Sequence, residues 1–146
     1  HLLYRKWRRL PAVCRRHEPD VYELLDLNVG KCRMAVAAQK DFVDDTSTTL
    51  RVATKFTNIA RKFYAEKCRD IDIIHLNGSI ELAPIVGLSE VIVDIVETGS
   101  TLRENGLTVL EEVCPLSARM VVNQVSMRME NERITKLIQD LKGALV

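Results

Sequence analysis

The sequence predicts an α/β fold with a mainly parallel sheet, and three patterns support that prediction. Strand and helix patterns alternate between residues 51 and 105 of the 146-residue chain. Residues 91–96 form an apolar run interrupted only by Asp94, which is typical of a strand buried on both faces. An apolar stripe with helical spacing follows at residues 134–145. These patterns indicate a globular protein in which helices pack on a sheet.

The composition supports this class and argues against several others. Apolar residues make up 47% of the chain and charged residues 28%, which is typical of a globular protein. No apolar run approaches the roughly 18 residues of a membrane helix, and no signal-peptide pattern is visible. The four cysteines lack a C-x-x-C pair and a histidine at ligand spacing. We therefore expect reduced thiols in a cytoplasmic protein with no membrane partner.

The charge is spread unevenly along the chain. The formal net charge is +1, but residues 1–16 contain six Lys and Arg residues and no acid, so the remainder carries −5. A basic arm of this kind binds nucleic acid or acidic lipid in some proteins. Here it contains Pro11 and lacks a helical apolar period, so we expect no nucleic-acid partner and keep a nucleic-acid binder as the last alternative.

The first third of the chain predicts elements ahead of the alternating unit. Apolar residues at helical spacing predict a short helix over residues 20–27. A strand pattern covers residues 31–38, and the polar stretch 41–49 is interpreted as a crossover between domains or subdomains. Residues 51–53 then predict a short strand, with which the alternation begins.

Two helices of the alternating unit are predicted from side chains that would cap them. Asn58 is placed to cap a helix that runs to about Lys67. Residues 71–76 predict the next strand, and an Asn-Gly-Ser turn follows it. Ser79, the last residue of that turn, is placed to cap a helix over residues 80–86.

The last third of the chain predicts two strands between two helices. A short helix is expected to open at residues 98–101 and to run to Asn105, where Gly106 ends it. Strands are expected over residues 107–113 and 117–123, separated by Pro115. The final helix is the clearest element of the sequence. Its apolar stripe contains Ile134, Leu137, Ile138, Leu141 and Leu145.

The turn after the strand 91–96 carries the chemistry of the sequence. Ligands of open α/β sheets bind beyond the carboxyl ends of the strands, where this Glu-Thr-Gly-Ser-Thr turn lies. Gly99 lets the backbone approach a bulky anion, and the start of a helix adds partial positive charge. Hydroxyl donors come from Thr98, Ser100 and Thr101. The turn therefore predicts a phosphate-binding cup, although a Ser/Thr-rich helix start taken alone is more often an ordinary helix cap.

Two acids flank the same turn. Asp94 and Glu97 are hydrogen-bond acceptors when ionised. They suit ribose hydroxyls, or a magnesium ion held on a phosphate. The alternative is that they belong to a solvated edge of the loop.

Four stretches in order carry a more specific signal. Residues 93–107 read VDIVETGSTLRENGL, with EPDVYELLDL at residues 18–27, RVATK at 51–55 and LNGSIELAP at 76–84. Together they resemble the ATP phosphoribosyltransferase family, and residues 93–107 are similar to its phosphoribosyl-pyrophosphate loop. The resemblance runs from about Glu18 to the C-terminus. The chain ends soon after the helix expected beyond residues 117–123, which is similar to the short form of the catalytic subunit, a form that lacks the C-terminal regulatory domain of the long form.

The resemblance implies a periplasmic-binding-protein-like (type II) catalytic fold of two α/β domains with the active site between them. Residues 50–112 would form the second domain, which holds the phosphoribosyl-pyrophosphate loop. Residues 18–49 and 113–146 would be the remnant of an incomplete first domain. Residues 1–17 form a basic arm that does not match the family, whose opening strand and Pro-Lys-Gly-Arg-Leu type loop are absent. We interpret this arm as a sign of N-terminal truncation or of a shifted reading frame.

The resemblance also implies a reaction and its residues. The family consists of pentosyltransferases that transfer phosphoribosyl from phosphoribosyl pyrophosphate to N1 of the adenine of ATP, the first step of histidine biosynthesis. Asp94 and Glu97 would be catalytic residues near the ribose. The residues that would bind phosphoribosyl pyrophosphate are Thr98, Gly99, Ser100, Thr101 and Leu102.

Two further residues and a cofactor follow from the resemblance. Lys55 and Glu81 match motif positions that face the cleft. Lys55 equally fits a solvated loop lysine, and Glu81 equally fits an acid favoured in the first turn of a helix. The implied cofactor is Mg²⁺, bound with phosphoribosyl pyrophosphate, and no metal site of protein side chains alone is expected.

The implied partners are ATP, phosphoribosyl pyrophosphate and a regulatory subunit that resembles histidyl-tRNA synthetase, in a cytoplasmic hetero-oligomer. The first alternative is a small-ligand-binding module of the same fold without catalysis. The second is a fragment that only associates with other subunits. A preference for phosphoribosyl pyrophosphate over amino acids would separate the enzyme from the binding module.

Overall fold

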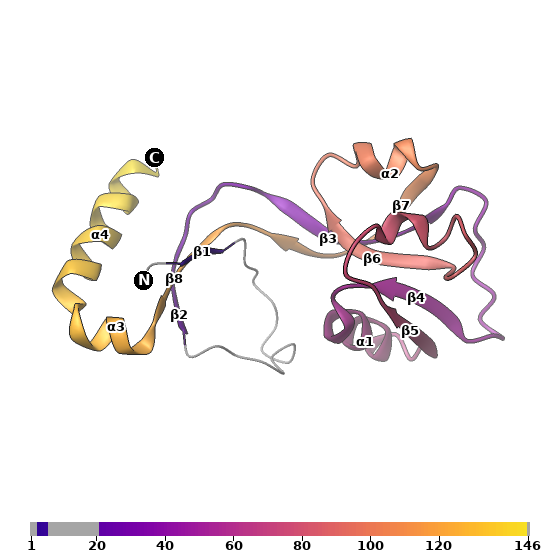
Figure 1. The fold of residues 1–146 in the computed structure, drawn as a ribbon, viewed down its shortest axis with the longest axis horizontal. Coiled ribbons are helices and arrows are strands. Elements are labelled where there is room, and N and C mark those ends of the chain that lie inside the picture. The colour runs from indigo at the N-terminus through magenta and orange to yellow at the C-terminus, as the bar shows by residue number, and fades with distance from the viewer. Residues whose placement is uncertain (1–2, 6–20, 146) are drawn as a thin grey trace. The chain divides into compact units, whose positions relative to one another are not determined.

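A computed structural model of the chain describes residues 3–5 and 21–145 (Figure 1). The described residues divide into two compact units. The larger unit spans Cys32–Pro115, and the smaller one contains residues 3–5, 21–31 and 116–145. Apart from residues 3–5, the basic arm predicted for residues 1–17 lies outside the described part of the chain.

The larger unit is built on a five-stranded sheet of order β5-β4-β6-β3-β7. The strands are β3 (Cys32–Gln39), β4 (Leu50–Thr54), β5 (Ile71–His75), β6 (Val91–Val96) and β7 (Leu107–Leu116). Strand β4 pairs in parallel with β5 and β6, whereas β3 runs antiparallel to β6. The predicted parallel arrangement is thus confirmed in the part of the sheet where strands and helices alternate.

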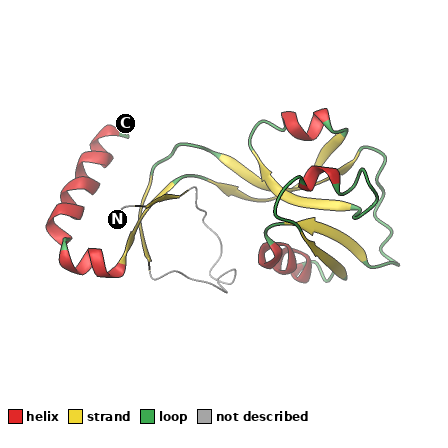
Figure 2. Cartoon of the chain, viewed as in Figure 1, coloured by secondary structure: helices red, strands yellow, loops and turns green. Residues whose placement is uncertain are grey.

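Helices cover both faces of this sheet (Figure 2). Helix α1 (Thr57–Glu66) lies on one face, and the 3₁₀ helix η2 (Ile80–Leu82) and helix α2 (Ser100–Glu104) lie on the other. Strand β6 is central, and its first three residues are each at most 1% exposed. The face under α2 and η2 forms one apolar cluster, made by Ala35, Ala37, Ala53, Ile80, Ala83, Ile92, Val96, Leu102 and Leu107.

A buried hydroxyl fixes the end of β4. Thr54 is fully buried, and its Oγ1 donates to the Val93 carbonyl of β6 at 2.6 Å. The same oxygen accepts the backbone N–H of Phe56 at 2.9 Å. One side chain therefore joins β4 to β6 and sets the path of the chain into α1.

Replacement of this hydroxyl tests the contribution of these two bonds. Thr54→Val keeps the shape but leaves the buried Val93 carbonyl without this donor and the Phe56 N–H without its acceptor. We expect a loss of about 1–3 kcal/mol in the free energy of unfolding, measured by urea denaturation. Thr46→Val, in an exposed position of the same unit, is the control and should stay within about 0.5 kcal/mol of the parent chain. Equal midpoints for both variants would contradict the assignment.

The smaller unit contains a three-stranded antiparallel sheet and two helices. Strand β8 (Arg119–Asn123) pairs with β1 (Leu3–Arg5) on one side and with β2 (Val21–Asp26) on the other. Helix α3 (Gln124–Met129) follows β8, and α4 (Asn131–Ala144) ends the described chain. The prediction of the final helix is confirmed, and Ile134, the first residue of its apolar stripe, is buried.

The prediction of a helix over residues 20–27 is wrong, because this segment is β2. Its backbone pairs with β8, and Arg119 of β8 forms ion pairs with Glu23 at 3.2 Å and Asp26 at 2.9 Å. Leu24 and Leu25 are adjacent in the sequence, and the pairing with β8 accommodates them by a register shift between Glu23 and Leu25. That irregularity imitates helical spacing in the sequence, and pairing with a distant strand outweighs local propensity.

Other boundaries also differ from the predictions. The helix expected over residues 80–86 is only the three-residue η2, because Pro84 has no N–H to donate to the Ile80 carbonyl. Neither predicted cap is formed, since α1 starts at Thr57, before Asn58, and Ser79 makes no side-chain cap bond. Strand β7 continues through Pro115, which an edge strand tolerates. Helix α3 was not predicted.

The polar stretch 41–49 connects β3 to β4 within the sheet of the larger unit. Arg69 holds it by an ion pair with Asp44 at 2.8 Å and by a hydrogen bond to the Thr48 carbonyl at 2.7 Å. The family resemblance implied domain boundaries at residues 17/18, 49/50 and 112/113, and these boundaries stay a prediction. Among the described residues, no helix is both long enough and apolar enough to cross a membrane.

Candidate functional site

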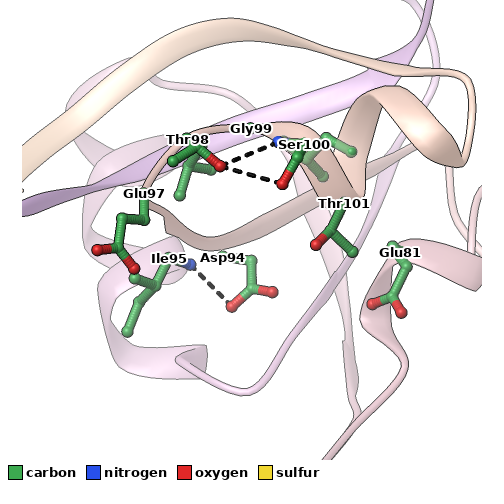
Figure 3. Close-up of a pocket in the computed structure, with 10 residues that line it drawn as sticks. Glu81, Asp94, Ile95, Glu97, Thr98, Gly99, Ser100 and Thr101 are labelled. Atoms are coloured by element: carbon green, nitrogen blue, oxygen red, sulfur yellow. Dashed lines mark hydrogen bonds between the residues drawn. The ribbon is translucent and has the colours of Figure 1, made fainter.

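A pocket of about 310 Å³ lies beyond the carboxyl end of β6 (Figure 3). Its lining consists of Glu81 and the continuous segment 94–102. The pocket therefore brings together all the predicted site residues except Lys55. Leu102 also belongs to the apolar cluster of this face of the sheet and is only 8% exposed.

The alternation of strand β6 explains the position of Asp94. Successive side chains of a strand point to opposite faces, so Asp94 shares a face with Ile92 and Val96. Both of these residues belong to the apolar cluster covered by α2 and η2. The Asp94 carboxyl is thus placed at the border between an apolar layer and the pocket, and it is half-buried.

The charge state of Asp94 reflects this border position. Burial raises the pKa of the Asp94 carboxyl above its ordinary value, and the negative charge of Glu81 acts in the same direction. The backbone N–H of Ile95, which donates to Asp94 Oδ1 at 2.8 Å, lowers the pKa, as does the charge of Lys55. Lys55 lies outside the pocket lining, but its charge acts on the pocket through Asp94.

The turn after β6 has a backbone that requires glycine. Gly99 has φ 75° and ψ 7°, in the left-handed region that side-chain-bearing residues rarely adopt. A Cβ built on Gly99 would lie 3.3 Å from Arg103 Nη1 and 3.8 Å from Val96 Cγ1. Helix α2 consequently starts at Ser100, two residues later than predicted, and ends at Glu104.

Hydroxyl groups of the turn point toward one another and toward the pocket. The Thr98 Oγ1 and Ser100 Oγ atoms are 3.0 Å apart, and the Ser100 N–H donates to Thr98 Oγ1 at 3.4 Å. Figure 3 shows the Asp94 and Glu81 carboxyl groups and the Thr101 hydroxyl converging on the same space. The arrangement places hydroxyl and N–H donors at one side of the pocket and two carboxylates at another.

This division suits a ligand that carries both an anion and hydroxyl groups. Donors of the turn can hold a phosphate, and carboxylates can accept hydrogen bonds from sugar hydroxyls. No group of three or more His, Cys, Asp or Glu residues in the described ranges 3–5 and 21–145 is arranged to hold a metal ion.

One residue that contacts the turn was not among the site residues predicted from the sequence. Arg103 Nη1 donates to the Thr98 carbonyl at 3.1 Å, across five residues. Its position in the last turn of a predicted helix indicated only a favourable place for a cation. A side chain that folds back onto its own loop leaves no periodic signal in the sequence.

Comparison with known proteins identifies relatives of the chain. The family model described as HisG, ATP phosphoribosyltransferase, matches residues 12–143. The ATP phosphoribosyltransferase of Lachnoclostridium phytofermentans is 66% identical over 129 residues, which cover 86% of this chain and 60% of that protein. The chain thus spans about 60% of the length of the curated relatives it matches.

Solved structures agree with this match. The chain is similar to the ATP phosphoribosyl transferase (HisG:HisZ) complex from Thermotoga maritima, with a TM-score of 0.76 and 37% identity, over 86% of this chain and 62% of that one. A substrate-binding protein of an amino acid ABC transporter has a TM-score of 0.55 at 14% identity, over 78% and 55% of the two chains. The second likeness concerns the fold alone, and it confirms the prediction of a periplasmic-binding-protein-like α/β fold.

Proposed function

The chain belongs to the ATP phosphoribosyltransferase family, and on that premise we propose that its pocket is the phosphoribosyl-pyrophosphate site of a short-form catalytic subunit. The reaction of the complete protein would be attack by N1 of the adenine of ATP on the anomeric carbon of phosphoribosyl pyrophosphate. Pyrophosphate leaves, and a phosphoribosyl group is transferred. This pentosyl transfer is the first step of histidine biosynthesis.

The observation that carries the proposal is the convergence of a phosphate-type turn and two carboxylates on one pocket. In the proposed complex, the N–H and hydroxyl groups of residues 98–101 bind the 5-phosphate. This contact anchors the substrate at the end remote from the bond that breaks, and so it fixes the orientation of the ribose. Leu102 supports the contact by anchoring α2 in the core.

Asp94 and Glu97 would act at the ribose. Positive charge develops on the ribose when pyrophosphate departs from the anomeric carbon, as it does in other glycosyl transfers. A carboxylate held beside the ring stabilises that charge and accepts hydrogen bonds from the ring hydroxyls. Half-buried Asp94 is the better placed of the two, because a carboxylate partly removed from water interacts more strongly with a nearby charge. Glu81 and Lys55 would adjust the field around it.

Magnesium fits this pocket as an ion shared with the substrate. Magnesium ions in proteins are commonly held by one or two carboxylates together with substrate phosphates. Asp94 and Glu81 both line the pocket and could provide such carboxylates. The ion, when bound, neutralises charge on the departing pyrophosphate.

The proposed assembly includes a second kind of subunit. The relative from Thermotoga maritima is described as a HisG:HisZ complex, and this chain is 37% identical to it. We therefore place the complete protein in a cytoplasmic hetero-oligomer with a regulatory subunit that resembles histidyl-tRNA synthetase.

The competing function is a ligand-binding module, favoured only by the likeness to amino-acid-binding proteins. Calorimetric titration of the purified chain separates the two. We expect heat of binding with phosphoribosyl pyrophosphate and Mg²⁺ and none with L-arginine, because the pocket offers donors for a phosphate. Amino-acid binding without phosphoribosyl-pyrophosphate binding would instead support the module. Complex formation with the regulatory subunit without turnover would support an association fragment.

A further inference from the structure

Arg103 contacts the pocket turn at two consecutive carbonyl groups. Its Nη1 donates to the Thr98 carbonyl at 3.1 Å, and its backbone N–H donates to the Gly99 carbonyl at 3.0 Å. The same Nη1 lies 3.3 Å from the position that a Cβ of Gly99 would occupy. The guanidinium thus fills the space that the missing side chain leaves open.

These contacts determine where the N–H groups of the turn point. In a trans peptide the C=O and the following N–H point in opposite directions, and the described chain contains no cis peptide. The Thr98 carbonyl is in the same peptide plane as the Gly99 N–H, and the Gly99 carbonyl is in the plane of the Ser100 N–H. The guanidinium holds the Thr98 carbonyl and so keeps the Gly99 N–H pointing away from itself. The bond to the Gly99 carbonyl comes from the backbone N–H of residue 103, and any side chain at that position would retain it.

We propose that Arg103 is a positioning residue, which preorganises the N–H group of Gly99 for the 5-phosphate of phosphoribosyl pyrophosphate. The identity of the ligand rests on the function proposed above. Arg103 does not belong to the pocket lining, so it acts through the turn and not by touching the phosphate. Preorganised donors bind an anion more tightly because they lose less freedom on binding.

Three substitutions separate this role from a general effect of charge. Arg103→Met removes the side-chain donors and the charge. It should weaken phosphoribosyl-pyrophosphate binding about 10-fold. This is at the low end for a charge-assisted contact, because Arg103 is exposed. Arg103→Lys keeps a cationic donor and should recover most of that loss. Arg61→Met removes the same charge from α1, which provides no pocket residue, and should change the affinity less than twofold.

A second readout does not depend on the ligand. In two-dimensional NMR spectra of the free chain labelled with ¹⁵N, the Gly99 amide signal should shift in Arg103→Met. The reason is that the carbonyl of the same peptide group, that of Thr98, loses its hydrogen bond from Arg103. The Gly87 amide, which donates to the Pro84 carbonyl, should keep its position. If Arg103 only stabilised the fold, Arg103→Met would lower the melting temperature, but the Gly99 signal and the affinity of the folded variant would stay unchanged.

The outcomes distinguish this inference from the proposed function. If the parent chain binds phosphoribosyl pyrophosphate and Arg103→Met binds it equally well, the positioning role is wrong and the proposed function stands. Equal losses in Arg103→Met and Arg61→Met would also overturn it, because charge alone would then explain the effect. If the folded parent chain binds no phosphoribosyl pyrophosphate, the proposed function fails, and the role of Arg103 in binding fails with it.

Discussion

Gly99→Val is expected to weaken phosphoribosyl-pyrophosphate binding at least 100-fold. Gly99 has φ 75°, a conformation that costs a β-branched residue about 1–3 kcal/mol. The new Cβ would also meet Arg103 Nη1 at 3.3 Å, and so disturb the hydrogen bond to the Thr98 carbonyl. Because Gly99 lines the pocket, the valine methyl groups would in addition occupy space next to the bound phosphate.

The chain offers a matched control for this substitution. Gly106 has φ 71°, nearly the same backbone conformation, but a Cβ there would meet nothing within 4 Å. Gly106→Val should therefore lower stability by a similar backbone cost and leave the affinity unchanged. Calorimetric titration with phosphoribosyl pyrophosphate and Mg²⁺ measures the affinity, and thermal unfolding by circular dichroism verifies that each variant is folded. Gly99→Ala replaces Gly99→Val if the latter fails to fold.

The comparison of these two glycines decides whether the turn is the phosphate site. Binding lost in the Gly99 variants and retained in Gly106→Val would assign the phosphate to the turn. Affinity within threefold of the parent chain in a folded Gly99→Val would exclude the turn, and with it the basis of the proposed function. Similar losses at both glycines would show that general destabilisation, and not the pocket, controls binding.

The sequence predicted this turn well because its signals are local. An apolar run ends at Val96 and a glycine follows three residues later, so strand, turn and helix start are all visible within ten residues. The prediction of strand 91–96 is confirmed to the residue. The site residues that line the pocket are almost all neighbours in sequence, which is why a single motif contains seven of the nine predicted residues; Glu81 comes from a second motif.

Features that depend on distant contacts were missed or misassigned. Strand β2 was predicted as a helix because its pairing with β8, about a hundred residues away, is invisible to local periodicity. The half-buried state of Asp94 depends on helices η2 and α2, which cover its face of the sheet. The bond from Arg103 to the Thr98 carbonyl joins a helix side chain to the loop before that helix. In each case the deciding interaction arises only after the chain has folded.

Asp94→Asn should reduce activity and at the same time stabilise the chain. If the carboxylate stabilises charge on the ribose, its loss should lower turnover of the assembled enzyme about 100- to 1,000-fold. The asparagine keeps the shape and can still accept the Ile95 N–H bond through its carbonyl oxygen. Asp72→Asn, on the exposed side of edge strand β5, is the control and should affect neither property.

The stability change follows from the sign of the pKa shift. Burial, reinforced by Glu81, raises the folded-state pKa of Asp94 above its ordinary value of 3.8, so the folded chain holds this proton more tightly than the unfolded chain does. Asp94 therefore destabilises the fold as pH rises from 3.8 through the raised pKa, and the cost is complete above that range. Asn carries no charge and avoids the cost, so Asp94→Asn should melt at a higher temperature than the parent at neutral pH.

The pH dependence of both properties makes this prediction decisive. The melting temperatures of Asp94→Asn and the parent should converge as pH falls toward 3.8, where Asp94 is protonated in the folded chain. Turnover of the parent should decrease as pH is lowered toward the raised pKa of Asp94. The carboxylate is then protonated at a higher pH than an ordinary aspartate would be. A variant that melts lower than the parent at neutral pH would show that Asp94 stabilises the fold, and a variant with full turnover would remove it from the reaction. Lower turnover together with higher stability would mark Asp94 as a residue kept for function at the expense of the fold.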